Sequence, residues 1–153
     1  MQGYGRFRGD GGMLLLSRWP VGEARDLSDF LWRDLPGAEL PPMPEGLVEV
    51  QRLSTSGHWI VPVAAPGGTV TLLAFAATPP VFDGPEDRNG LRNAAEIALW
   101  SMVLDGGFGE VPAAPVVLGN ANLDPVDGDG RREAIVALLT HPMLQDQIGR
   151  AHV

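Results

Sequence analysis

Apolar and polar residues alternate along the chain in a way that marks several strands and helices. Residues 58–63 and 69–75 are typical of strands, and Pro66-Gly67-Gly68 between them predicts a β-hairpin. The second strand carries apolar residues on both faces, which predicts a central position in a sheet. Short apolar runs at residues 13–16 and 116–118 predict two further buried strands.

Other segments repeat their apolar residues at helical spacing. This spacing predicts a short surface helix over residues 27–35 and longer helices over residues 89–104 and 131–141. Asp129 stands where it could cap the last of them. The order strand, helix, hairpin, helix, strand, helix predicts an α/β (α+β) fold built in layers.

Residues 116–130, VVLGNANLDPVDGDG, combine a strand, a polar tip and an acidic turn before the last helix. Ligands of α/β proteins gather at the carboxyl ends of strands, so this stretch is the first candidate for a functional site. Asp124, Asp127 and Asp129 are expected to be structural residues of a solvated turn. A calcium loop is the alternative, but Val126 and Gly128 fall where ligands are needed.

The composition argues against some classes of function. A net charge of −8 and a pI near 4.7 argue against a broad basic surface for nucleic acid. An acidic phosphoesterase that uses metal ions as its positive charge remains possible. The chain has no Cys and no apolar run of membrane-spanning length, so no membrane partner is expected. Its N-terminus lacks the apolar core of a signal peptide, and the localisation stays open.

Three blocks of the sequence resemble one family. GNANLDPVDGDG resembles the G-D-x-N-x-D motif of the endonuclease/exonuclease/phosphatase family, metal-dependent phosphoesterases related to pancreatic deoxyribonuclease. Residues 77–96, ATPPVFDGPEDRNGLRNAAE, are similar to a T-P-P-V-F-D-G-P-E-D-R-N-G-x-R-N run of a bacterial branch. Residues 2–20 resemble that branch's G-x-G-R-F-x-G-x-x-G-M-x-x-L-S-R-x-P segment. The blocks stand in the family's order.

The resemblance implies a fold and a domain organisation. Residues 1–147 would be the central part of a four-layer αββα sandwich, truncated at both ends. Sheet faces and strand edges would then be exposed, and the isolated chain would be marginally stable. Residues 148–153, IGRAHV, resemble the translation of a common sequencing-library adapter and are expected to be an artefact tail.

The resemblance also implies a site, which this chain matches only in part. A family member would use Mg²⁺ or Mn²⁺ to hydrolyse a phosphate ester or nucleic acid. The family's motif Asn is retained as Asn122, whereas its Asp is replaced by Asn120 and a catalytic His by Ala76. Neither replacement can move a proton, and no residue of this chain is assigned as a metal ligand. We therefore predict a phosphoesterase-family fragment that is inactive as it stands, with a non-catalytic binding module as the alternative.

A few other residues allow two interpretations. Arg88 and Arg92 could bind a phosphate or pair with Glu86 and Asp87. His58 could be a metal ligand, although a lone His beside a strand is more often a packing residue. Trp19 and Trp32 could stack on a base, but packing aromatics are expected.

Overall fold

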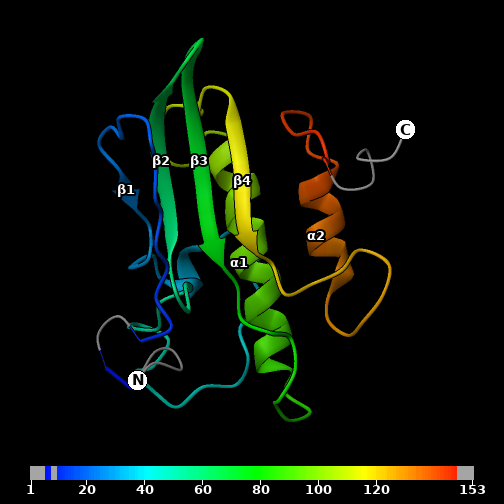
Figure 1. The fold of residues 1–153 in the computed structure, drawn as a ribbon. Coiled ribbons are helices and arrows are strands. Elements are labelled where there is room, and N and C mark those ends of the chain that lie inside the picture. The colour runs from blue at the N-terminus through cyan, green and yellow to red at the C-terminus, as the bar shows by residue number, and fades with distance from the viewer. Residues whose placement is uncertain (1–5, 8–9, 148–153) are drawn as a thin grey trace.

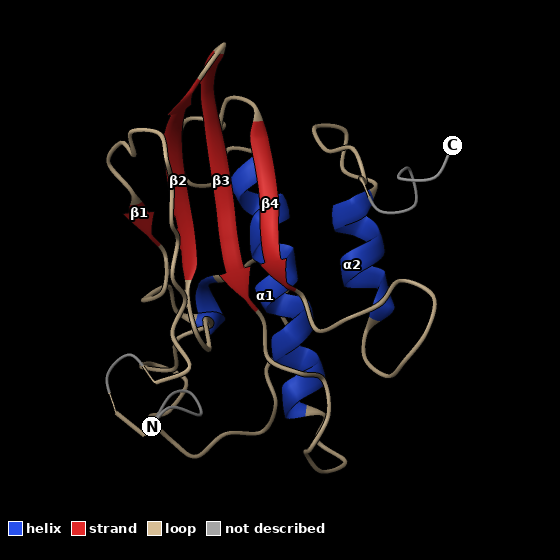
Figure 2. Cartoon of the chain, in the orientation of Figure 1, coloured by secondary structure: helices blue, strands red, loops and turns tan. Residues whose placement is uncertain are grey.

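The computed structural model describes residues 6–7 and 10–147, and they form one four-stranded sheet with helices against it (Figures 1 and 2). The strands lie in the order β1-β2-β3-β4. Their bounds are β1 (Arg25–Asp26), β2 (His58–Ala65), β3 (Gly68–Ala76) and β4 (Pro115–Asn120). Neighbouring strands are antiparallel except β3 and β4, which are parallel. This arrangement confirms the α+β class.

The β2–β3 hairpin and the central place of β3 are confirmed. Register pairs run from His58 with Phe75 to Ala65 with Gly68 at the turn. β3 hydrogen-bonds to β2 on one side and β4 on the other, so both of its edges are paired.

Both helices lie against one face of the sheet. α1 (Arg88–Leu104) runs behind β3 and β4, and α2 (Arg132–Leu139) packs beside it (Figure 1). Leu73 and Phe75 of β3 join Ile97 and Trp100 of α1 in this core, and α2 adds Ile135 and Leu138. The predicted long helix is confirmed to within one residue at its start.

The opposite face of the sheet carries no helix in the part of the chain that the structure describes (Figure 2). Side chains alternate along a strand, so the neighbours of the core-facing Leu73, Phe75 and Val117 point to this open face. Val116 and Leu118 are 45% and 38% exposed there. The prediction that residues 116–118 form a fully buried strand is therefore wrong, because β4 lies at the edge of the described sheet and one of its faces is open.

Two local predictions fail where tertiary pairing replaces local structure. Residues 13–16 form no strand, and Leu14 is 82% exposed. Residues 27–35 hold only a 3₁₀ turn, Trp32–Asp34, in place of the predicted surface helix. The Leu27 N–H donates to the His58 carbonyl and the Trp32 N–H to the Gln51 carbonyl, so backbone groups that a helix needs are already bonded.

The remaining predictions concern residues 119–153. Arg131 is the N-cap of α2 and no side chain caps it, so Asp129 does not have the predicted capping role. No helix in the described residues is long and apolar enough to cross a membrane. The proposed domain bounds stay a prediction, and the tail 148–153 lies outside the described residues, as do residues 1–5 and 8–9 of the first family block.

Candidate functional site

The two strands that carry the family-like positions end side by side. β3 and β4 are parallel, and their last register pair joins Ala76 to Asn120. Paired residues of neighbouring strands share a face, and for this pair it is the open face. The positions that resemble the family's His and Asp are therefore adjacent, although 43 residues separate them in the sequence.

The loop after β4 is bonded back onto the loop after β3. Asn122, in a left-handed conformation with φ 50°, donates its side-chain amide to the Ala77 carbonyl at 2.7 Å. Its own N–H donates to Asn120 Oδ1 at 2.9 Å. Asn tolerates this backbone conformation because its short polar side chain bonds locally. The amides of Asn120 and Asn122 thus fix the shape of the strand ends.

A cavity of about 610 Å³ opens at this edge. Pro79, Pro80 and Val81 line it after β3. The last two residues of β4 and most of the loop from Ala121 to Asp129 line it as well, and Ile135 and Leu139 of α2 close one side. The lining combines an apolar wall with the polar strand ends. Such a combination is typical of small-molecule sites.

Within the acidic loop, Asp124 stabilises the turn through hydrogen bonds to its backbone. Its Oδ1 accepts the N–H groups of Val126 and Asp127 at 2.7 and 2.8 Å. These bonds lower the Asp124 pKa. Arg132 closes the loop by donating to the Val126 and Gly128 carbonyls. The contacts match the expected structural turn, with Asp127 and Asp129 at the rim of the cavity.

The residues at this edge do not fit a magnesium or manganese ion. Such ions need several hard, preferably charged oxygen ligands. Within the described ranges, no three residues of His, Cys, Asp or Glu lie close enough to hold a metal. The strand ends offer Ala76 and two amides, one of which already accepts a backbone N–H.

Arg88 and Arg92, the predicted phosphate ligands, do not line this cavity. Arg92 donates to the carbonyls of Leu53 and Arg52, each at 2.8 Å, and lies 5.7 Å from the Trp32 ring centre. Arg88 lies within 3.4 Å of the Pro42 carbonyl. Of the two acidic partners proposed for them, Glu86 and Asp87, the second pairs with Arg131 at 3.0 Å.

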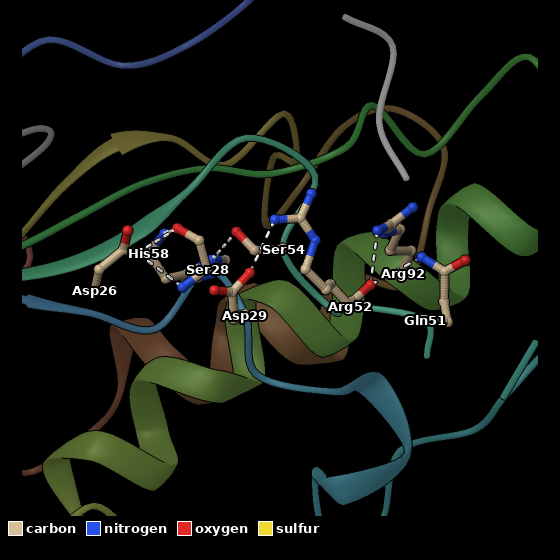
Figure 3. A network of polar contacts seen from close by, with 8 residues as sticks. All are labelled: Asp26, Ser28, Asp29, Gln51, Arg52, Ser54, His58 and Arg92. Carbon is tan, nitrogen blue, oxygen red and sulfur yellow. Dashed lines mark hydrogen bonds and ion pairs between the residues drawn. The ribbon is translucent and has the colours of Figure 1, made fainter. Parts of the chain in front are cut away.

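His58 is a buried packing residue (Figure 3). Its Nε2 lies 2.9 Å from the Glu96 carbonyl, which can only accept, so Nε2 carries the hydrogen and Nδ1 accepts from the Ser54 hydroxyl at 2.8 Å. Burial lowers the His58 pKa to about 4. The ring also packs against Phe75 and Trp100. The Ser28 hydroxyl receives the His58 N–H and bonds Asp26 in turn.

Of the two tryptophans considered above, one is buried and the other is exposed. Trp32 is 1% exposed and belongs to a second apolar cluster on α1, which confirms its packing role. Trp19 is 42% exposed beside Arg18.

Two polar residues that the sequence patterns missed lie beneath the strand ends. Glu96 and Asn93 of α1 are fully buried. Glu96 accepts the N–H groups of Thr55 and Thr78, both at 2.6 Å, and the two threonine hydroxyls bond each other. Asn93 donates to the carbonyls of Thr78 and Ala121, both at 2.7 Å. The available signal was their spacing, since both share a helix face with Trp100.

The fold is similar to part of a solved enzyme structure. Sphingomyelinase C from Streptomyces griseocarneus matches 81% of this chain with a TM-score of 0.50 and 15% sequence identity. This chain spans about 36% of that enzyme's chain. No family model and no curated protein matches the sequence. The likeness supports the fold implied by the family resemblance, whereas membership of that family stays a prediction.

Proposed function

We propose that this chain is part of a phosphoesterase-type domain, forms one edge of its phosphate-ester site, and has no hydrolytic activity by itself. The observation that carries the proposal is the register pair of Ala76 and Asn120. Two positions named by sequence resemblance alone lie next to each other at the end of parallel strands, and Asn120 lines the cavity.

The fold comparison agrees with this class of chemistry. Sphingomyelin is a phosphodiester, and the similar structure is a sphingomyelinase. Because the chain spans about 36% of that enzyme, a hydrolytic activity would belong to a longer protein. A divalent ion, Mg²⁺ or Mn²⁺, would neutralise the phosphate there, but the residues of this edge do not form its ligand set.

The chemistry left at the edge is binding without proton transfer. A primary amide can donate a hydrogen bond to a phosphate oxygen, yet it is not a general base at neutral pH. Ala76 has no proton to give or take. Loss of catalytic residues that act together lowers the rate of hydrolysis by orders of magnitude. We therefore expect this chain to hydrolyse phosphate esters no faster than the uncatalysed reaction.

A hydrolysis assay tests the inactivity. The chain is incubated with bis(4-nitrophenyl) phosphate and either Mg²⁺ or Mn²⁺, and released nitrophenolate is followed. We expect no release above that of Asn122→Asp, which disrupts the strand-end amides. Metal-dependent release by the unaltered chain, lost in that variant, would contradict the proposal.

A second experiment tests whether the edge belongs to a phosphate-ester site. Dimethyl phosphate is titrated with the Ala76→His/Asn120→Asp variant in Mg²⁺, and its ³¹P shift is measured. We expect a saturable shift with the double variant and none with the unaltered chain. Without any shift for the double variant, positions 76 and 120 would not form such an edge.

The second candidate is a non-catalytic binding module. Two observations favour it: the amide at position 120 and the absence of a metal-binding group in the described residues. A saturable dimethyl phosphate shift with the unaltered chain and no added metal, without hydrolysis, would favour this second candidate.

A further inference from the structure

A fully buried carboxylate, Glu96, accepts a hydrogen bond from the backbone just after β3. Glu96 of α1 (Arg88–Leu104) is 0% exposed. Burying a carboxylate is unfavourable unless hydrogen bonds stabilise it. A protein with a well-packed apolar residue at such a position is often at least as stable. The hydrogen bonds of Glu96 therefore indicate what it does.

The two carboxylate oxygens of Glu96 have separate partners. Oε1 accepts the Thr55 N–H and Oε2 accepts the Thr78 N–H, both at 2.6 Å. Thr55 lies in the segment before β2, and Thr78 lies two residues after the end of β3. The side chain therefore ties two backbone segments to α1. A carboxylate accepts well at both oxygens, whereas the corresponding amide of Gln offers one acceptor oxygen.

Asn93, one helical turn before Glu96, extends the same attachment. Its amide donates to the Thr78 and Ala121 carbonyls, so it ties the segment after β3 to the segment after β4. Asn122 adds a third bond across this junction through the Ala77 carbonyl. The strand ends that bring Ala76 and Asn120 together are thus attached to α1 from below.

We propose that Glu96 is the positioning residue of the candidate site: its buried carboxylate, with Asn93, holds the backbone after β3 and so sets the geometry of the strand ends. Burial also raises the pKa of Glu96 above its usual value, opposed by the Thr78 N–H and by Arg92. The other titratable groups nearby are His58, which bonds the Glu96 carbonyl, and Asp26, which interacts with His58. The role in the site rests on the proposed function, whereas the attachment itself is measured without any ligand.

Amide hydrogen exchange tests the attachment. In Glu96→Gln we expect exchange at Thr55 or Thr78 to rise at least about tenfold relative to the α1 amides of Ile97 and Trp100. Glu133→Gln, an exposed glutamate of α2, is the matched control and should leave the ratio unchanged. An equal rise at all four amides would overturn the proposal, because it would show only general destabilisation.

A titration of the unaltered chain gives a readout that needs no variant. The ¹³C shift of the Glu96 carboxyl group and the amide proton shifts of Thr55 and Thr78 should change with one shared midpoint, above 4.5. Amide proton shifts that do not change as the carboxyl group titrates would overturn the proposal.

The link to the site is tested by adding Glu96→Gln to the Ala76→His/Asn120→Asp variant. We expect at least about a tenfold loss of dimethyl phosphate affinity in Mg²⁺. An unchanged affinity, together with faster Thr78 exchange, would show an attachment that does not position the site. Failure of the double variant itself to bind would count against the proposed function, while the exchange result would still decide the attachment.

Discussion

Glu96 and Asn120 show two different fates of polar groups around the same strand ends. Glu96 keeps a carboxylate in a fully buried place and bonds two backbone segments. Asn120 is exposed on β4, where the family resemblance implies a carboxylate, and carries an amide that bonds within its own loop. The charge is retained where it is costly to bury and missing where it would react. Under the proposed function, this difference means that the buried groups that hold the strand ends are present while the reacting groups implied by the family resemblance are absent.

Removal of the Glu96 side chain and of the Asn120 side chain, in separate variants, should have very different effects on stability. Glu96→Ala leaves the Thr55 and Thr78 N–H groups buried without acceptors and should lower the free energy of unfolding by about 3–5 kcal/mol. Asn120→Ala should change it by less than about 0.5 kcal/mol, because the residue is exposed. Urea denaturation measures both. Similar losses would show that the buried groups and the exposed edge are not distinct.

The buried residues His58 and Glu96 make the free energy of unfolding depend on pH. The His58 pKa is lowered to about 4, so the unfolded chain binds the proton first as the pH falls. Stability should therefore be lost between about pH 6.5 and pH 4, by roughly 3 kcal/mol from this residue. Glu96, with its raised pKa, acts in the opposite direction. Its contribution is fully present below 4.5 and is lost as the pH rises through its folded-state pKa.

His58→Gln isolates the histidine contribution, because Gln can still donate to the Glu96 carbonyl and does not titrate. Denaturation curves of both chains at pH 7 and pH 4 give the comparison. The expected result is a smaller loss in the variant. Equal losses in the two chains would contradict a neutral, buried His58.

Gly119 lies at the exposed edge, where β4 approaches the backbone of β3 closely. A Cβ at this position would lie 1.9 Å from the Phe75 carbonyl oxygen, and its φ is +139°. Gly119→Ala should therefore cost about 2–4 kcal/mol and disturb the β3–β4 pairing. Gly128→Ala, in open space at φ +85°, is the matched control and should cost about 1 kcal/mol. Thermal unfolding measures both, and equal costs would exclude a tight approach of the strands.

The smallest predicted effect separates the two asparagines. Asn122→Asp replaces the donor that bonds the Ala77 carbonyl and should cost about 1 kcal/mol. Asn120→Asp keeps the oxygen that accepts the Asn122 N–H and should be close to neutral. Urea denaturation of the two variants checks the order, and a larger cost for Asn120→Asp would reverse the assignment of their roles.

The sequence predicted the hairpin, the central strand and α1 because each has a long and regular pattern. Residues 27–35 failed because their backbone groups pair with His58 and Gln51, which local spacing does not encode. The burial of residues 116–118 was overestimated because an apolar run does not tell whether both faces of a strand are covered.

For the site, resemblance named positions 76, 120 and 122, and register brought the first two together. Glu96 and Asn93 escaped notice because a polar residue in a helix is expected to face solvent. Their role depends on backbone groups of Thr55, Thr78 and Ala121, which no side-chain pattern records.

Mn²⁺ titration of four chains tests whether positions 76 and 120 together form one edge of a metal-dependent site, as the proposed function requires. The four chains are the unaltered chain, Ala76→His, Asn120→Asp and the double variant, measured by calorimetry. We expect negligible binding by the unaltered chain and a gain in the double variant that exceeds the combined gains of the single variants. Gains that merely add up, or no gain at all, would show that the two positions do not form one site.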